Sequence, residues 1–374
     1  MVDLFSQYER IKPEIDAAIQ NVIDTTAFIN GPDVKLFAKE LSEWLDVPYV
    51  IPCANGTDAL QVAIMALDLP KGSEIIVPAF NYVATAEVIA LLDMVPVFVD
   101  VLPGTFGIDP VKAEAAITGK TGAIMPVHLF GQCADMASIL AIAAKHKLFV
   151  IEDCAQAIGA KYTMPDGQVY TAGAMGHVGT TSFFPSKNLG CMGDGGAIFT
   201  VNEALAARMQ MIANHGQKKK YSYETIGVNS RLDTVQAALL RVKLRYLTSF
   251  TESRIDAATY YDDAFAAADN ILTPVRDPNS THVFHQYTIQ VLGQNRDELK
   301  ASLAAKGIPA MVYYPGPLHL QKAYEYLGFK AGDFPVAEHL CTQVISLPMH
   351  TELDEEQLAY ICSSVLELVS VAQN

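Results

Sequence analysis

Short apolar segments rich in β-branched residues alternate with longer amphipathic segments between residues 42 and 200. The short segments lack strict polar alternation, which is typical of strands that are buried on both faces of a sheet. Spaced by helices, they predict an α/β class protein with a mostly parallel sheet covered on both faces. Strands are expected at residues 74–78, 95–100, 123–127, 148–153, 181–184 and 196–200, and helices at 57–69, 84–92 and 136–146.

The pattern changes after residue 202, where long helical segments are followed by a mixed segment that contains proline and glycine. We therefore predict two domains: a large one at residues 1–250 and a smaller α+β one at residues 251–374. In this second half, helices are expected at 203–213, 234–247, 251–267, 298–306 and 354–371, and a strand at 288–292.

Composition and charge narrow the classes of function. The chain has 374 residues, of which 51% are hydrophobic and 18% charged, so a substantial core is expected rather than disorder. The net charge of −15 argues against nonspecific nucleic-acid binding, which requires a basic surface. An anionic substrate must therefore be met by a local site.

The cysteines and the most apolar segment indicate a cytoplasmic protein. Six cysteines are scattered without a C-x-x-C pair, which fits a reducing compartment and argues against a disulfide framework or a zinc knuckle, so no metal is expected. The segment 83–102 is interrupted by Glu87, Asp93, Pro96 and Asp100, so it is not expected to span a membrane. The N-terminus has no secretory apolar stretch.

The segment TSFFPSKNLGCMGDGGAIFT at residues 181–200 carries the candidate chemistry. Its single lysine, Lys187, follows a strand and a proline turn and is surrounded by glycines. Desolvation lowers the pKa of a lysine, which makes the neutral amine a nucleophile toward an aldehyde. The alternative is an ordinary surface lysine in a turn. A dinucleotide loop is disfavoured because the G-x-G-x-x-G order is absent.

Other residues fit a site for the aldehyde cofactor pyridoxal phosphate (PLP). PLP enzymes need a carboxylate that keeps the pyridine nitrogen protonated. Asp153 ends an apolar strand, where α/β folds place ligands, and Gln156 follows three residues later. Asp153 could equally be a helix cap.

A phosphate site is expected where CANGTDALQVAIMAL begins a helix. Gly56 permits close approach, Thr57 can cap and donate, and the hydroxyl of Ser182 can add a donor. Tyr82 follows a strand and fits an aromatic plane over the pyridine ring. Simple capping and a core position are the alternatives for these residues.

Taken together, these blocks resemble the DegT/DnrJ/EryC1/StrS family of sugar aminotransferases. This family is a branch of the PLP-dependent transferase type I (aspartate aminotransferase-like) fold. The matching blocks follow one another over nearly the whole chain: ANGTDAL, PAFNYVATAEVI, PVHLFGQCADM, EDCAQAIGA, SFFPSKNLGCMGDGGAIFT, GVNSRLDTVQAALL and YYPGPLHLQKAY.

The resemblance implies roles for individual residues. Lys187 would form the covalent link to PLP, and Asp153 would pair with the pyridine nitrogen. Gln156 would lie on the side of the ring hydroxyl, and Tyr82 would stack on the ring. The phosphate would be held by Gly56, Thr57 and Ser182, and by Asn229 of the neighbouring subunit, which implies a homodimer with shared active sites.

The resemblance also implies the substrates. The donor would be L-glutamate, and the acceptor a UDP- or dTDP-linked keto sugar, closest to UDP-2-acetamido-2-deoxy-3-oxo-glucuronate, used for a surface polysaccharide such as O-antigen. Substrate contacts would come from Arg231, Tyr313, Tyr314 and His319. Many relatives carry His-Tyr in place of Tyr313-Tyr314, a departure within the expected substrate loop.

Two other functions stay open at this point. Members of the family have been described as regulators or sensors, so a PLP-binding protein without turnover is one alternative. The sequence shows no basic helix-turn-helix segment for DNA binding. A nicotinamide dehydrogenase is disfavoured because its glycine fingerprint is missing.

Overall fold

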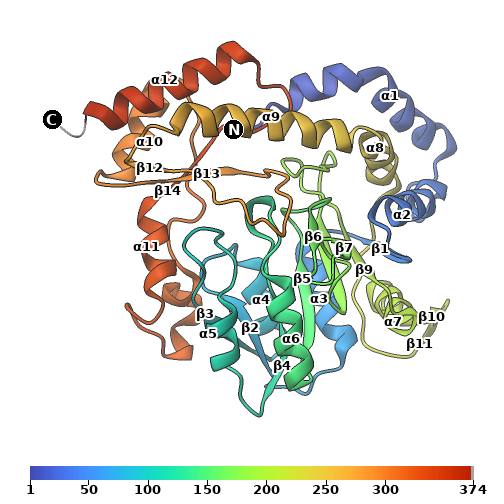
Figure 1. The fold of residues 1–374 in the computed structure, drawn as a ribbon. Helices are drawn as coiled ribbons and strands as arrows, with labels where there is room; N and C mark the ends of the chain where they lie inside the picture. The colour runs from blue at the N-terminus through green and yellow to red at the C-terminus, as the bar shows by residue number, and fades with distance from the viewer. Residues whose placement is uncertain (372–374) are drawn as a thin grey trace.

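The computed structural model describes residues 1–371 and is built around one seven-stranded sheet of order β1-β9-β8-β5-β4-β2-β3 (Figure 1). Strand β9 is antiparallel to both of its neighbours, and the other neighbouring pairs are parallel. The predicted mostly parallel sheet is confirmed. Its strands are β1 (Tyr49–Cys53), β2 (Glu74–Pro78), β3 (Val95–Val99), β4 (Thr121–Ile124), β5 (Phe149–Asp153), β8 (Val178–Ser182) and β9 (Gly196–Thr200).

Helices cover both faces of this sheet because successive side chains of each strand point to opposite sides. On β5, Ile151 packs into the core beneath α3, α4 and α7, whereas Val150 packs into the core beneath α5 and α6. Beside β9, the second face is covered by α2 and α8. The bounds are α2 (Pro32–Leu45), α3 (Gly56–Leu67), α4 (Ala84–Leu91), α5 (Pro110–Ala115), α6 (Met136–His146), α7 (Glu203–Ala213) and α8 (Thr234–Leu244).

The C-terminal part forms a smaller α+β layer with its own core. A three-stranded antiparallel sheet of order β12-β13-β14 packs against α9, α10 and α12. Figure 1 shows α9 running across the top of the molecule from α8 to α12. The bounds are α9 (Leu247–Phe265), β12 (Ile271–Leu272), β13 (Tyr287–Val291), α10 (Arg296–Ala305), α11 (Pro335–Gln343), β14 (Val344–Leu347) and α12 (Glu355–Val371).

Helix α9 crosses the predicted division at residue 250, because it begins at Leu247. The division into two domains at that residue stays a prediction. The buried Arg254 on α9 donates hydrogen bonds to the carbonyls of Phe284 and Met349, which ties this helix to the end of the small sheet where β13 begins and β14 ends.

Helix α1 and several short elements complete the fold. Helix α1 (Leu4–Thr25) packs against α8 through Ile11 and Ile15. No helix among residues 1–371 is long and apolar enough to cross a membrane. The short elements are β6 (Lys161–Thr163), β7 (Val169–Thr171), β10 (Gln217–Lys219), β11 (Ser222–Tyr223), η1 (Leu129–Gly131), η2 (Leu318–Leu320) and η3 (Lys322–Leu327).

Candidate active site

A cavity of about 640 Å³ opens at the carboxyl ends of β2, β5 and β8. This is the edge of a parallel sheet at which α/β proteins bind ligands. Segments 285–286 and 312–314 of the C-terminal part close the opposite wall. The lining residues are Asn55, Gly56, Thr57, Leu60, Asn81, Tyr82, Ala84, Val127, Phe130, Asp153, Ala155, Gln156, Ser182, Phe184, Ser186, Lys187, Asp194, His285, Gln286, Val312, Tyr313 and Tyr314.

Lys187 is the single lysine or arginine that lines this cavity. It lies in the connection between β8 and β9, whose ends are paired at Ser182 and Gly196. The next residue, Asn188, donates a hydrogen bond to the carbonyl of Val283 at 2.8 Å, so the loop is anchored to the C-terminal part. Burial lowers the pKa of Lys187 from 10.5 to about 8, and the negative charge of Asp153 partly opposes this shift. A neutral nucleophilic amine is therefore accessible near physiological pH.

Glycine is required within the Lys187 loop. A Cβ atom on Gly190 would lie 2.3 Å from the carbonyl oxygen of Pro185, which is closer than real contacts allow. The loop therefore folds back on itself only because residue 190 has no side chain.

Asp153 and Gln156 present polar groups beside Lys187. Asp153 is 6% exposed, and its Oδ1 atom accepts a hydrogen bond from the N–H of Ala155 at 3.0 Å. Gln156 accepts from the N–H of Phe130 at 2.8 Å and donates to the hydroxyl of Tyr314 at 3.0 Å. Both side chains are thus held in fixed orientations at the floor of the cavity.

The start of α3 forms a compact cradle that fits a phosphate. Asn55 caps the helix by accepting from the N–H of Asp58 at 2.8 Å, and Gly56 and Thr57 are the first helical residues. A Cβ atom on Gly56 would lie 2.7 Å from Cβ of Ser182, so this helix end and β8 approach closely. The remaining N–H groups of the first turn can bind an anion. With Lys187 and Asp153 in the same cavity, the residues present fit PLP.

Aromatic side chains line the side of the cavity where Tyr82 faces segment 312–314. Tyr82 is 56% exposed and lies with its ring centroid 6.2 Å from that of Tyr314. Tyr313 also lines the cavity. Burial raises the pKa of the Tyr314 hydroxyl, so this group stays protonated and can donate or accept hydrogen bonds near neutral pH.

Three expected site residues lie outside the lining of this cavity. Asn229 is exposed, as a contact to a second subunit would require. Nε of Arg231 is buried and makes no hydrogen bond within residues 1–371. His319 is buried, bonds Glu338 at 3.0 Å and packs against Phe334, and its substrate contact stays a prediction.

Sequence reasoning missed several lining residues, among them Asn81, Asp194, His285 and Gln286. Asn81 stood inside the quoted block PAFNYVATAEVI, where a polar residue just after a strand was the available signal. Asp194 was the acidic residue of the glycine-rich segment. Segment 285–286 carried no signal, since it reaches the cavity only through the folding of the C-terminal part.

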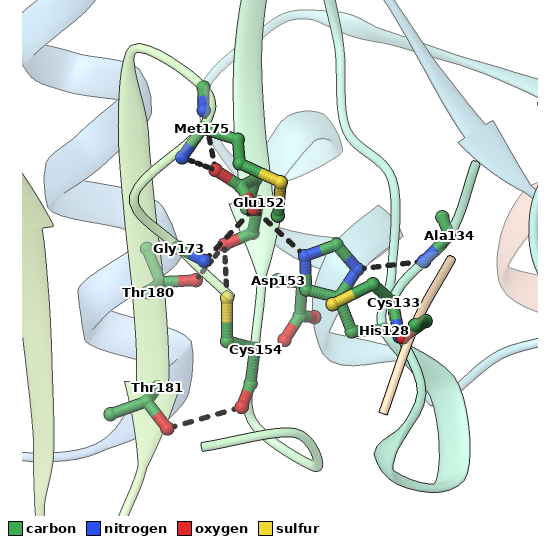
Figure 2. Close-up of polar contacts among 12 residues, drawn as sticks. His128, Cys133, Ala134, Glu152, Asp153, Cys154, Gly173, Met175, Thr180 and Thr181 are labelled. Carbon is green, nitrogen blue, oxygen red and sulfur yellow. Dashed lines mark hydrogen bonds and ion pairs between the residues drawn. The ribbon is translucent and has the colours of Figure 1, made fainter. Parts of the chain in front are cut away.

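A second polar network lies on the other face of β5. Figure 2 shows Glu152 facing His128, with the backbone of Ala134 on the far side of the imidazole. Nδ1 of His128 accepts from the N–H of Ala134 at 3.1 Å, so Nε2 carries the proton that is donated to Glu152 at 2.9 Å. The carboxylate of Glu152 also accepts from the N–H groups of Gly173, Met175 and Gly176.

This network includes three potential metal ligands, His128, Glu152 and Cys154. The oxygens of Glu152 are already occupied by N–H donors, and burial raises the pKa of the Cys154 thiol well above 9.0. A metal would need the thiolate and free lone pairs. A structural hydrogen-bond network therefore explains these residues better than a metal site does.

Comparisons with known proteins agree with this fold and site. The profile of the DegT/DnrJ/EryC1/StrS aminotransferase family matches residues 9–366. The S. venezuelae enzyme DesV, solved in complex with a ketimine intermediate, superposes with a TM-score of 0.94 at 38% identity, covering 98% of this chain and 97% of the other. Spr1654 from Streptococcus pneumoniae in its PLP form superposes with a TM-score of 0.90 at 26% identity, covering 96% and 97%.

Relatives of known name are similar over nearly their full lengths. A pleiotropic regulatory protein of Geobacillus stearothermophilus is 47% identical, with 98% of this chain and 97% of the relative covered. The UDP-2-acetamido-2-deoxy-3-oxo-D-glucuronate aminotransferase of Pseudomonas aeruginosa is 45% identical, with 97% and 98% covered. The dTDP-3-amino-3,4,6-trideoxy-alpha-D-glucose transaminase of Streptomyces venezuelae is 38% identical, with 98% and 95% covered.

The fold and the cavity define a PLP-dependent aminotransferase. The chain belongs to the DegT/DnrJ/EryC1/StrS aminotransferase family, as the sequence blocks indicated.

Proposed function

We propose that this aminotransferase moves the amino group of L-glutamate to a nucleotide-linked keto sugar, at C3 of UDP-2-acetamido-2-deoxy-3-oxo-glucuronate. The observation that carries the amino transfer is Lys187, the single lysine or arginine of a cavity that also holds Asp153 and the start of α3. Support for the uronate comes from the relative of that name, which is 45% identical.

Different residues of this chain would bind the cofactor and move the proton. Bound PLP supplies an aldehyde that condenses with amines and a pyridine ring that accepts electrons. Asp153 holds the proton on the ring nitrogen, and the first turn of α3 binds the phosphate. Nζ of Lys187 would act as general base and then as general acid. It would remove the proton from the α-carbon of the amino donor and return it to the cofactor carbon that receives the amino group. The ring of Tyr82 and segments 285–286 and 312–314 would shield the reacting atoms from water.

Replacing Lys187 tests the catalytic assignment. Lys187→Ala should abolish turnover and the absorbance of covalently bound cofactor. The matched control is Lys243→Ala on α8, because burial also lowers the pKa of Lys243 to about 8, yet this lysine lies outside the cavity. Full catalytic activity in Lys187→Ala contradicts the assignment, and equal loss in both variants shows that Lys187 has no special role.

The sugar is tested by direct comparison of acceptors. The enzyme is incubated with glutamate and either the UDP-linked 3-keto-uronate or a dTDP-linked 3-keto-6-deoxyhexose, and the product is weighed by mass spectrometry. Conversion of the uronate alone supports the proposal. Conversion of the deoxyhexose alone favours the second candidate, which the 38% identical transaminase represents.

A PLP-binding regulator without turnover is the competing function, because the 47% identical relative is named a pleiotropic regulatory protein. Addition of glutamate to the PLP-loaded protein discriminates between them. A catalyst converts the cofactor to its pyridoxamine form within the assay, which is visible as a change of absorbance. An inert binder leaves the spectrum unchanged.

The proposal has further parts. The product would enter a surface polysaccharide such as O-antigen, and the cytoplasm would be the location. The chain would act as a homodimer in which Asn229 of each subunit serves the neighbouring site. The exposed position of Asn229 supports this arrangement.

A further inference from the structure

Two buried polar side chains form a hydrogen-bonded row that ends at Asp153, and neither has a role in the mechanism proposed above. Thr85 on α4 is 1% exposed, and its Oγ1 atom lies 3.0 Å from Oδ2 of Asp153. Asn81, which precedes α4, is 3% exposed, and its Nδ2 atom lies 2.6 Å from the same Oγ1 atom. The three side chains form one continuous path from the end of β2 to the end of β5.

The direction of both hydrogen bonds follows from the chemistry of the groups. An ionised carboxylate only accepts, so the hydroxyl of Thr85 must donate its one hydrogen to Asp153. That hydroxyl can then only accept from its other neighbour, which requires the NH2 group of Asn81 to face it. The order of donation is therefore Asn81 to Thr85 to Asp153.

The local structure leaves Thr85 free for this contact. A threonine inside a helix commonly donates to the carbonyl four residues earlier. Thr85 is the second residue of α4, and the residue four positions earlier is Asn81, which contributes its side chain instead. As a β-branched residue, Thr85 has few rotamers, so the direction of its hydroxyl is well defined.

We propose that Thr85 is a positioning residue that fixes the carboxylate of Asp153 toward the ring nitrogen of bound PLP, and that Asn81 orients Thr85. This inference rests on the role proposed for Asp153. With Thr85 on Oδ2 and the N–H of Ala155 on Oδ1, both oxygens are held and the plane of the carboxylate is fixed. The lone pairs that remain face the cavity, where they are ready for the ring N–H without reorganisation.

Two substitutions of Thr85 separate hydrogen bonding from shape. Thr85→Val keeps the branched shape and removes the hydroxyl, whereas Thr85→Ser keeps the hydroxyl and removes a methyl group. We expect Thr85→Val to weaken PLP binding to the apoenzyme by about tenfold or more, because a hydrogen bond to a charged group is lost. Thr85→Ser should stay within about threefold of the wild type, since the donor is kept.

The matched control is Thr181→Val on β8. Thr181 is also 1% exposed, and its hydroxyl donates to the backbone carbonyl of Cys154 at 3.2 Å, next to Asp153 but not to its carboxylate (Figure 2). This variant removes the same group at the same depth. It should lower the melting temperature of the apoenzyme without the loss of PLP affinity.

The readouts are the dissociation constant of PLP by equilibrium dialysis, the pH titration of the absorbance of bound PLP, and the melting temperature of the apoenzyme. Asn81→Ala serves as a second variant should Thr85→Val not fold, and it should weaken PLP binding in the same direction. A shifted absorbance titration in Thr85→Val, restored in Thr85→Ser, supports the proposal, because loosened packing alone would not follow the hydroxyl.

Three results overturn the inference: Thr85→Val binds and titrates as the wild type, Thr85→Ser is as defective as Thr85→Val, or Thr181→Val matches Thr85→Val in PLP affinity. Asp153→Asn is measured alongside to separate the role proposed for Asp153 from the positioning role proposed for Thr85. If Asp153→Asn leaves PLP binding and the titration unchanged, the role proposed for Asp153 fails. If Asp153→Asn is defective and Thr85→Val is not, only the positioning role fails.

Discussion

If Lys187 captures PLP as proposed, its burial sets the pH at which the apoenzyme can do so. Only the neutral amine attacks an aldehyde. Because burial lowers the pKa of Lys187 to about 8, the rate of PLP capture should rise about tenfold per pH unit below that value and level off above it. An unperturbed lysine would give no plateau until about pH 10.4. Stopped-flow absorbance of apoenzyme mixed with PLP measures this profile.

The same experiment on Asp153→Asn tests the electrostatic part of the shift. The charge of Asp153 raises the pKa of Lys187, so its removal should move the plateau to lower pH. An unchanged profile, or a shift to higher pH, would contradict the cause given for the pKa of Lys187.

Glu152 differs from its neighbour Asp153 because every contact that it makes is structural. Glu152→Gln would set an NH2 group against N–H donors that now point at the carboxylate. We expect the free energy of unfolding of the apoenzyme to fall by about 3 kcal/mol, the scale of a broken buried charge contact. Urea denaturation measures the change. The exposed pair of Glu114 with Lys145 gives the control, since Glu114→Gln should change stability by less than about 1 kcal/mol.

Single residues were predictable where a sequence block surrounded them with a distinctive pattern. Lys187 stood in a glycine-rich turn, and Asp153 ended an apolar strand. Thr85 had no such signal, because a threonine on an apolar helix reads as ordinary core. His285 was equally hidden, since its place in the cavity depends on how β13 packs against the rest of the chain.

At the scale of elements, the close approach of α3 to β8 is the feature most exposed to substitution. Gly56→Ala would place a methyl group 2.7 Å from Cβ of Ser182 and push the start of the helix away from the strand. We expect a loss of PLP affinity of about tenfold or more, because the N–H groups proposed to bind the phosphate would move with the helix. Equilibrium dialysis with PLP measures it.

Gly119→Ala is the control for this substitution, because a Cβ atom on Gly119 would meet nothing within 4 Å. It should bind PLP as the wild type does. If Gly56→Ala also binds PLP with unchanged affinity, the start of α3 is not the phosphate site.

The elements themselves were predicted well where apolar positions extended without interruption. Strands β2 and β9 lie at the expected residues. Strand β1 (Tyr49–Cys53) was missed. The strand expected at 181–184 lies at Val178–Ser182 instead, because Phe184 belongs to the loop and is 52% exposed. Apolar composition alone could not separate the buried Phe183 from its exposed neighbour.

At the scale of the whole molecule, the proposed sharing of sites between subunits can be tested by mixing inactive variants. Lys187→Ala and Asn229→Ala should each lose most activity as homodimers. In a hybrid dimer, one site carries both substitutions and the other carries none, so mixing under subunit exchange should restore about a quarter of wild-type activity. Recovery is measured in the glutamate assay after incubation at equal concentrations.

One control accompanies this experiment. Light scattering gives the oligomeric state of each variant before mixing. No recovery, with subunit exchange shown to occur, would mean that Asn229 acts within its own subunit or not at all.

The class of fold followed from the sequence, because parallel strands buried on both faces leave a recognisable pattern of apolar segments. Segment 285–286 of the cavity wall did not, since it is distant in sequence from the sheet and meets it only after the chain has folded. Tyr313 and Tyr314 were expected only through the family resemblance. Local sequence patterns predict local structure, whereas this part of the cavity wall is formed by contacts between segments far apart in the sequence.

All six cysteines, Cys53, Cys133, Cys154, Cys191, Cys341 and Cys362, are buried, and none is in a disulfide within residues 1–371. A maleimide reagent should therefore find few reactive thiols on the native protein. A single cysteine introduced on the surface would then be the preferred point for a fluorophore or spin label. Distances between subunits and motions of the loop that carries Lys187 could then be measured without first replacing the native cysteines.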